Sequence, residues 1–203
     1  ASFADNIHLN ADISAVTREN NQVQLHFASG EIQTFDEVVL ACHSDQALAL
    51  LGDASEQEQN ILGAIPYSDN SVVLHTDISL LPKRQKAWAS WNYQLTSNRT
   101  KPASVTYNMN ILQGLNSEHT FCVTLNQRED IDPSKVLREF TYHHPVFSIA
   151  SIEAQRQRIQ ICGQQNTHFV GAYWYSGFHE DGVRSAVDVA QRFDCYLQDS
   201  AAK

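Results

Sequence analysis

Four runs of alternating apolar and polar residues follow one another between residues 70 and 126. The runs are 70–77, 87–95, 103–112 and 120–126. Alternation at period two places successive side chains on opposite faces of an extended chain, so each run is typical of a half-buried strand. Turn-forming residues separate the runs, which indicates antiparallel neighbours. The sequence therefore predicts one antiparallel sheet from Ser68 to Asn126.

The first fifty residues predict a strand meander that leads into a helix. Runs at 7–16, 23–28 and 31–42 are joined by RENNQ and SG, which favour hairpin turns. The third run ends in EVVLAC, whose apolar residues are typical of a strand buried on both faces. HSDQALALLG then predicts a short helix with Ser44 or Asp45 as N-cap and Gly52 as stop. A second helix is predicted over 55–65.

The rest of the chain mixes helix and strand signals. Residues 132–145 fit either class, 151–160 predict a short helix and 167–172 a final strand. A last helix is expected to begin at Asp181 or Gly182. Its spacing predicts buried Val183, Ala186, Val187 and Ala190, with Arg184 and Asp188 exposed. The predicted fold class is α+β, with a mixed, mainly antiparallel sheet and a few helices.

Composition narrows the classes of function. The chain has 14 basic and 23 acidic residues, a formal net charge of −9, and no cluster of Lys and Arg, so nucleic acid and anionic membranes are disfavoured as partners. An anionic partner would need a local site. The four cysteines lack zinc or disulfide spacing and predict free thiols in a reducing, cytoplasmic location. No run approaches the length of a membrane span, so integral membrane association is not expected.

The junction between the predicted final strand and final helix is a candidate binding site. The first N–H groups of a helix have no intrahelical acceptor and carry partial positive charge, which suits a phosphate, a carboxylate or another electron-rich group. A capped helix after a strand also occurs without any ligand, and that alternative stays open. His179, Glu180 and Asp181 at this turn, like His143 and His144, favour cap or packing roles, and no metal site is predicted.

Several segments together resemble the C-terminal part of predicted NAD/FAD-binding proteins of the flavin-containing amine oxidoreductase superfamily. They are EVVLACHSDQAL, IPYSDNSVVLHTDISLLP, AWASWNY, YHHPVF and NTHFVGAYWYSGFHEDGVRSAVDVA. The resemblance implies FAD as cofactor and a small-molecule substrate. It implies Gly171 and Ala172 near the pyrophosphate and Ile13 near the adenine. It also implies cofactor contacts from Phe178, His179, Glu180, Asp181 and Gly182 near the flavin ring and ribityl chain.

The sequence departs from this superfamily in one large respect. No G-x-G-x-x-G motif, which would let the backbone approach the pyrophosphate, is present, and the chain starts in mid-pattern without Met. We therefore expect a fragment in which 1–52 and 166–203 belong to the FAD domain and 53–165 to the substrate domain. FAD is expected in the full-length protein and not in the fragment. A homo-oligomer is also possible.

Aromatic residues supply the candidate substrate contacts. Alternation places Trp91 and Tyr93 on one face of their strand, where lining a pocket and plain sheet packing are equally compatible with the pattern. The other candidates are Tyr107, Tyr173 and Trp174. No catalytic residue is singled out. The expected function is transfer of a hydride equivalent to flavin from an apolar, lipid-like substrate or an amine. The alternative is a non-enzymatic ligand-binding or interaction domain.

Overall fold

A computed structural model describes residues 3–94 and 104–197. The chain forms two compact units, each described here by itself. Unit 1 consists of 1–67 and 145–203, and unit 2 of 68–144. These boundaries fall inside the predicted segment 53–165, and the assignment of segments to a FAD or a substrate domain stays a prediction.

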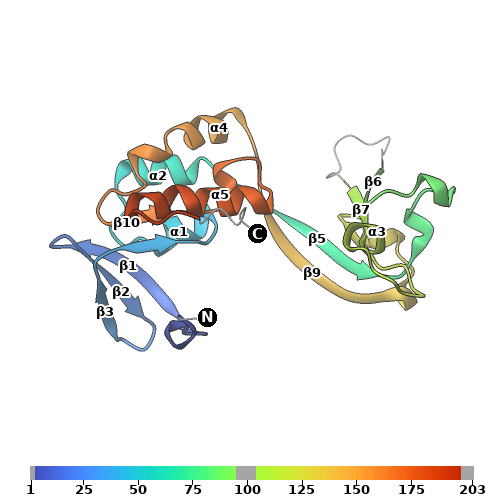
Figure 1. Cartoon of the computed structure of the whole chain (residues 1–203), viewed down its shortest axis with the longest axis horizontal. Helices are drawn as coiled ribbons and strands as arrows, with labels where there is room; N and C mark the ends of the chain where they lie inside the picture. The colour runs from blue at the N-terminus through green and yellow to red at the C-terminus, as the bar shows by residue number, and fades with distance from the viewer. Residues whose placement is uncertain (1–2, 95–103, 198–203) are drawn as a thin grey trace, which may run out of the picture. The chain divides into compact units, whose positions relative to one another are not determined.

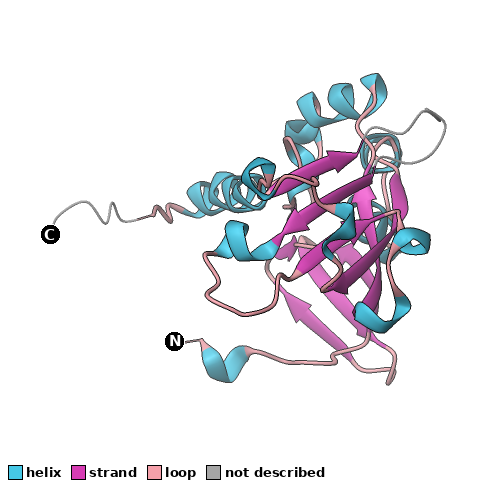
Figure 2. Ribbon diagram, turned by 90° about the vertical axis from the view of Figure 1, so that its right-hand side faces the viewer, coloured by secondary structure: helices cyan, strands magenta, loops and turns pink. Residues whose placement is uncertain are grey.

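The elements mix both classes of secondary structure, and the predicted α+β class is confirmed (Figures 1 and 2). The strands are β1 (Ile13–Glu19), β2 (Gln22–Phe27), β3 (Ile32–Phe35), β4 (Val38–Leu40), β5 (Tyr67–His75), β6 (Trp91–Gln94), β7 (Ser104–Asn108), β8 (Cys122–Leu125), β9 (Val136–Pro145) and β10 (Thr167–Phe169). The α-helices are α1 (Ser44–Leu50), α2 (Glu56–Gly63), α3 (Met109–Gln113), α4 (Ile149–Arg156) and α5 (His179–Ala190). Short 3-10 turns lie at 4–6, 78–80, 85–87, 128–130, 133–135, 158–160, 172–174 and 191–193.

The N-terminal meander is confirmed as the antiparallel sheet β1-β2-β3. Asn20 and Asn21 connect the first two strands with φ values of 53° and 61°, the left-handed pair that matches the twist of a two-residue hairpin. The first strand begins at Ile13 rather than at Ile7. The predicted strand 31–42 is divided into β3 and β4, which pair with different partners.

β4 and β10 form a parallel pair that joins the two chain segments of unit 1. Figure 1 shows α1, α2, α4 and α5 gathered around β10. The prediction that β4 is buried on both faces is wrong, because the side chain of Val39 is 47% exposed while Leu40 is buried. Its partner β10 is buried at all three positions, so the cover over this pair does not extend to Val39. Both predicted helices that follow are confirmed as α1 and α2, although the N-cap of α1 is His43.

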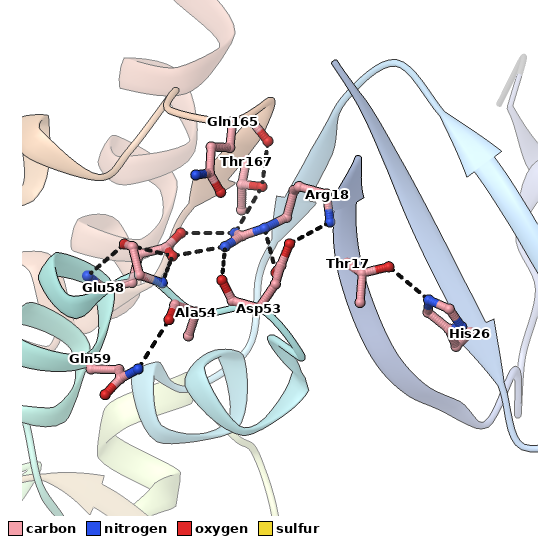
Figure 3. Close-up of polar contacts among 10 residues, drawn as sticks. Thr17, Arg18, His26, Asp53, Ala54, Glu58, Gln59, Gln165 and Thr167 are labelled. Carbon is pink, nitrogen blue, oxygen red and sulfur yellow. Dashed lines mark hydrogen bonds and ion pairs between the residues drawn. The ribbon is translucent and has the colours of Figure 1, made fainter. Parts of the chain in front are cut away.

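The core of unit 1 is apolar, with one buried ionic group at its edge. Val23, Leu62 and Phe169 have no exposed side-chain surface. The Arg18 guanidinium donates to both carboxylate oxygens of Glu58 at 2.8 Å and lies 2.8 Å from a carboxylate oxygen of Asp53 (Figure 3). Burial alone would raise the pKa of Glu58, but the hydrogen bonds from Arg18 and Ser55 lower it. The group therefore remains an ion pair inside the unit.

The last helix differs from its prediction in two ways. It begins at His179, because the Asp181 carboxylate accepts a hydrogen bond from the Phe178 N–H and so closes the first turn earlier. Its buried residues are Ser185 and Val189, one position away from the predicted set. Val183 and Ala186 are exposed, Val187 and Ala190 are partly buried, Arg184 is exposed as predicted, and Asp188 is partly buried.

Unit 2 contains a five-stranded sheet in the order β6-β7-β8-β5-β9. The antiparallel pairs β6–β7, β7–β8 and β5–β8 confirm the sheet predicted for 68–126. The third run ends early because the Asn108 side chain accepts a hydrogen bond from the Ile111 N–H and caps α3. The ambiguous stretch 132–145 forms a 3-10 turn followed by β9. Across the described residues, no helix is long and apolar enough to cross a membrane.

Candidate functional site

The strand register of unit 2 separates two chemically different faces of its sheet. Residues paired across antiparallel strands lie on the same face. One face therefore carries two rows: Trp91, Tyr107, Val123 and Leu74, and Tyr93, Val105, Leu125 and Val72. We call these eight residues the apolar face. The other face carries Asn92, Thr106, Thr124 and Val73, Gln94 with Ser104, and Asn108, Cys122 and His75.

The mainly polar face is the buried one. Its hydroxyl groups form a chain in which Thr124 Oγ1 lies 2.8 Å from both Thr106 Oγ1 and His75 Nε2. Ser104 donates to the side-chain oxygen of Gln127 at the next level of the sheet. Burial lowers the pKa of His75, which favours the neutral imidazole that this chain requires. The polar face is thus satisfied internally and has no need of a ligand.

The apolar face remains accessible. Trp91 is 53% and Tyr93 62% exposed, whereas among the eight residues only Val72 is fully buried. The rings of Trp91 and Tyr107 meet edge to face with centroids 5.3 Å apart. None of the eight side chains carries a charge at neutral pH. Three of the five predicted substrate residues, Trp91, Tyr93 and Tyr107, therefore lie on one surface that suits an apolar ligand.

Tyr173 and Trp174, the other two predicted substrate residues, lie in unit 1. Each is 3% exposed and packs in the apolar core. The Trp174 indole donates to the Phe169 carbonyl at 3.0 Å, while no hydrogen-bond partner for the Tyr173 hydroxyl occurs in the described part of the chain. Burial raises the pKa of Tyr173 far above its ordinary value. This enclosure favours a packing role, and their role toward a substrate stays a prediction.

The carboxyl ends of β4 and β10 form a second candidate site, in unit 1. The Val170 N–H donates to the Leu40 carbonyl and extends the parallel pairing to the point where both strands end. Ligands of open α/β sheets bind at such strand ends. Cys42 and His43 follow β4, and the His43 ring stacks on Tyr67 with centroids 4.3 Å apart. Sequence reasoning did not select Cys42, His43 or Tyr67, although both strand-to-helix junctions were recognised.

Gly171 at this edge is required by packing. A Cβ atom at Gly171 would lie 2.3 Å from Cε1 of the Tyr173 ring, a distance that real contacts do not show. The Gly171 N–H already donates to Ser185 Oγ at 2.8 Å. The glycine therefore has a structural explanation, and the expected contacts of Gly171 and Ala172 with a pyrophosphate stay a prediction.

The start of α5 presents an open turn. Phe178 is 57% exposed, and His179 and Glu180 are also exposed. The N–H groups of His179 and Glu180 lie in the first helical turn, where no intrahelical acceptor exists. The carboxylates of Glu180 and Asp181 lie in the same turn and oppose a second anion there. The turn thus fits the edge of a neutral ring system with acceptor atoms better than a pyrophosphate. Gly182 packs at ordinary distance against Ala172.

Ile13 lies in a different part of unit 1. It is 38% exposed at the start of β1, beside a register irregularity, and lines an apolar hollow with Leu9, Leu25 and Phe27. In the described part of the chain, no hydrogen bond or ring contact joins Ile13 to residues 171–182. No group of His, Cys, Asp and Glu able to hold a metal ion occurs among residues 3–94 and 104–197.

Comparisons with known proteins identify the fold. No family model and no curated protein matches the sequence. A fatty acid isomerase from P. acnes, described as producing CLA, matches with a TM-score of 0.59 and 16% identity over 90% of this chain and 47% of its own. Cyclohexylamine oxidase from Brevibacterium oxydans IH-35A matches with a TM-score of 0.56 and 12% identity. The match covers 94% of this chain and 50% of the oxidase. Putrescine oxidase matches with a TM-score of 0.62 and 10% identity over 95% of this chain and 50% of its own.

These similarities extend over nearly all of the chain and about half of each enzyme. At 10–16% identity they show a common fold and not a common activity. The mixed α+β architecture with its antiparallel sheets matches part of these enzymes. The chain therefore has the fold of about half of each of these enzymes.

Proposed function

We propose that the chain is part of a flavin-dependent oxidoreductase that removes a hydride equivalent from an apolar, lipid-like substrate. The observation that carries the proposal is the accessible apolar face of unit 2, in a chain whose fold matches about half of a fatty acid isomerase and of a putrescine oxidase. Unit 2 would bind the hydrocarbon part of the substrate, and unit 1 would contribute to the cofactor site.

The chemistry of the apolar face favours a hydrocarbon over an amine. The desolvation cost of a cationic amine that leaves water is compensated most directly by a carboxylate. The two rows contain three aromatic and five aliphatic residues and no carboxylate. The same surface offers dispersion contacts and apolar area to an acyl chain at no such cost. Both an isomerase named for a fatty acid and oxidases named for amines share the fold, so the fold itself does not decide between these substrates.

In unit 1, the residues that fit FAD are those of the open turn at the start of α5. FAD would accept the hydride equivalent. The N–H groups of His179 and Glu180 would donate to acceptor atoms at the ring edge, and Phe178 would pack against the ring. Buried Trp174 and Tyr173 would hold the backbone of 171–174 behind this turn.

Flavin content and flavin reduction test the proposal. We expect the intact protein to copurify with about one flavin per chain and the 203-residue chain to be flavin-free, because the sequence lacks the glycine-rich turn that holds a pyrophosphate. Under anaerobic conditions, an unsaturated fatty acid such as oleate should bleach the flavin of the intact protein, whereas putrescine and cyclohexylamine should not. An intact protein without flavin would favour the non-enzymatic alternative, and bleaching by the amines alone would overturn the choice of substrate.

Oleate binding to the 203-residue chain tests the apolar face without the flavin. Calorimetric titration should show saturable binding that Tyr93→Ser weakens by about tenfold, since an aromatic ring contributes on the order of one or two kcal/mol of apolar contact. Tyr196→Ser is the matched control, because Tyr196 is similarly exposed, at 66% against 62%, but lies in unit 1. Equal weakening by both variants would contradict the assignment of the face.

A further inference from the structure

Three arginines converge on a hollow of unit 1 that is separate from both sites described above. Arg156 ends α4, Arg158 begins the following 3-10 turn and Arg192 lies in the turn after α5. Together with Gln155, Ile159 and Asp188 they line a cavity of about 280 Å³. We call this hollow the arginine pocket. It lies at the C-terminal half of α5, whereas the candidate cofactor turn lies at its start.

Two of the three positive charges in the arginine pocket have no carboxylate partner. The Asp188 carboxylate accepts from Arg158 Nη1 at 2.8 Å and from the Tyr175 hydroxyl, so its charge is already paired. Among the described residues, neither Arg156 nor Arg192 has a carboxylate within ion-pair distance. The pocket is therefore a local excess of positive charge on a chain whose net charge is −9. It is the kind of local site that an anionic partner of this acidic chain would need.

Two of the arginines are held in place before any ligand arrives. Arg158 Nη2 donates to the carbonyl groups of Phe169 and Ser185, and its guanidinium lies 5.5 Å from the Trp174 ring. Arg192 Nη1 donates to the Cys162 carbonyl and passes over Gly163, where a Cβ atom would come within 1.9 Å of it. Gly163 has φ of +84°, so the position suits glycine for its backbone as well. Fixed donors lose little side-chain entropy when an anion binds.

We propose that the arginine pocket binds a phosphate group. Arg156 and the remaining donors of Arg192 would form charge-assisted hydrogen bonds to its oxygens, and the paired Arg158 would add to the positive potential behind them. The cavity, at about 280 Å³, is large enough for a phosphate group. The site is independent of the proposed oxidoreductase activity, since it uses none of the residues assigned to flavin or substrate.

Phosphate titration of the 203-residue chain tests the pocket. At low ionic strength, inorganic phosphate should bind saturably and shift the side-chain N–H signals of Arg156 and Arg192 in nuclear magnetic resonance spectra. The double variant Arg156→Gln/Arg192→Gln should weaken binding by about tenfold or more, as expected for lost charge-assisted hydrogen bonds. Lys83→Gln/Arg84→Gln removes the same charge from exposed positions of unit 2 and should leave binding unchanged. Absence of saturable binding, or equal weakening by both double variants, would overturn the proposal.

The phosphate could be free or carried by a lipid headgroup, and vesicles distinguish the two sources. Ile149, Ile152 and Ile159 flank Arg156 at helical spacing and are 79%, 43% and 72% exposed. Phosphatidylcholine vesicles with and without phosphatidic acid are the probes. A lipid headgroup would be assigned if the chain sediments with phosphatidic acid vesicles and both Arg156→Gln/Arg192→Gln and Ile159→Ser weaken this sedimentation. In that case Ile159→Ser should leave the binding of inorganic phosphate unchanged. Binding of inorganic phosphate without sedimentation would assign a free phosphate, and failure of both probes would refute the site.

Discussion

The core of unit 1 is mainly apolar, whereas the sheet of unit 2 buries its mainly polar face. Unit 1 has an apolar core around Leu62 and Phe169, with the polar Arg18 group enclosed at its edge. In unit 2 the sheet buries a hydrogen-bonded chain formed by the Thr106 and Thr124 hydroxyl groups and the His75 imidazole. It leaves the apolar face accessible. Apolar side chains left accessible on one face of a sheet gain little from burial in the folded chain. The difference is consistent with the proposal that the apolar face of unit 2 binds a ligand.

The largest expected effect comes from the buried ion pair of unit 1. Arg18→Met should destabilise the protein by about 3–5 kcal/mol, because the substitution leaves Glu58 buried without its cation. Urea unfolding would measure the loss. Arg128→Met is the matched control in unit 2, where the Glu139 partner is 52% exposed and about 0–1 kcal/mol is expected. Similar losses in the two variants would remove the contrast between the units.

The packing of Gly171 gives the next largest effect. Gly171→Ala should cost about 1–3 kcal/mol through the clash with the Tyr173 ring. A double-mutant cycle with Tyr173→Ala measures the coupling, because the alanine has room once the ring is removed. Additive losses would show that the cost of Gly171→Ala does not arise at the Tyr173 ring.

The buried Asp77 carboxylate of unit 2 should make the free energy of unfolding depend on pH. Burial alone would raise the pKa of Asp77, but N–H donors of Asp132 and Ser79 and the Lys135 ammonium lower it below its usual range. A lowered folded-state pKa contributes stability above the unfolded value of about 4, and this stability is lost as the pH falls through the folded value. Asp77→Asn should therefore cost about 1 kcal/mol at neutral pH and less in acid.

Unfolding of Asp77→Asn and of the unsubstituted chain at a series of pH values measures this difference. A cost that stays constant from pH 7 to about pH 3 would contradict an ionised Asp77 in the folded protein. Lys135→Met removes one donor to Asp77, and the Lys135 side chain is 44% exposed. This variant should therefore lower the free energy of unfolding less than Asp77→Asn does.

The smallest effect on stability is expected on the apolar face itself. Tyr93→Ser should change the free energy of unfolding by no more than about 0.5 kcal/mol, because the side chain is 62% exposed. The same variant should weaken oleate binding, as proposed above. A large loss of stability without a change in oleate binding would mean that the face serves folding, and the comparison between the units would fail.

The candidate sites were predictable in part. Alternation placed Trp91 and Tyr93 on one face, and the structure confirms this and adds Tyr107 by strand pairing. The junctions after residues 37–42 and 167–172 were recognised one at a time. Their meeting through β4 and β10 was not, because strands more than a hundred residues apart leave no local signal of their pairing. His43 and Tyr67 were missed for the same reason.

The sequence by itself determined most of the strands and helices, with errors at their ends such as that of β1, which begins at Ile13 rather than at Ile7. Alternation and the Asn20–Asn21 turn act within a few residues, and the structure has the strands they predict. Only the tertiary structure decided which face each element buries. The terminal helix is one such case, with Ser185 and Val189 buried in place of Val183 and Ala186. The sheet of unit 2 is another, because a polar face can be buried only when distant hydroxyl and imidazole groups satisfy one another, and such pairing is a property of the folded chain.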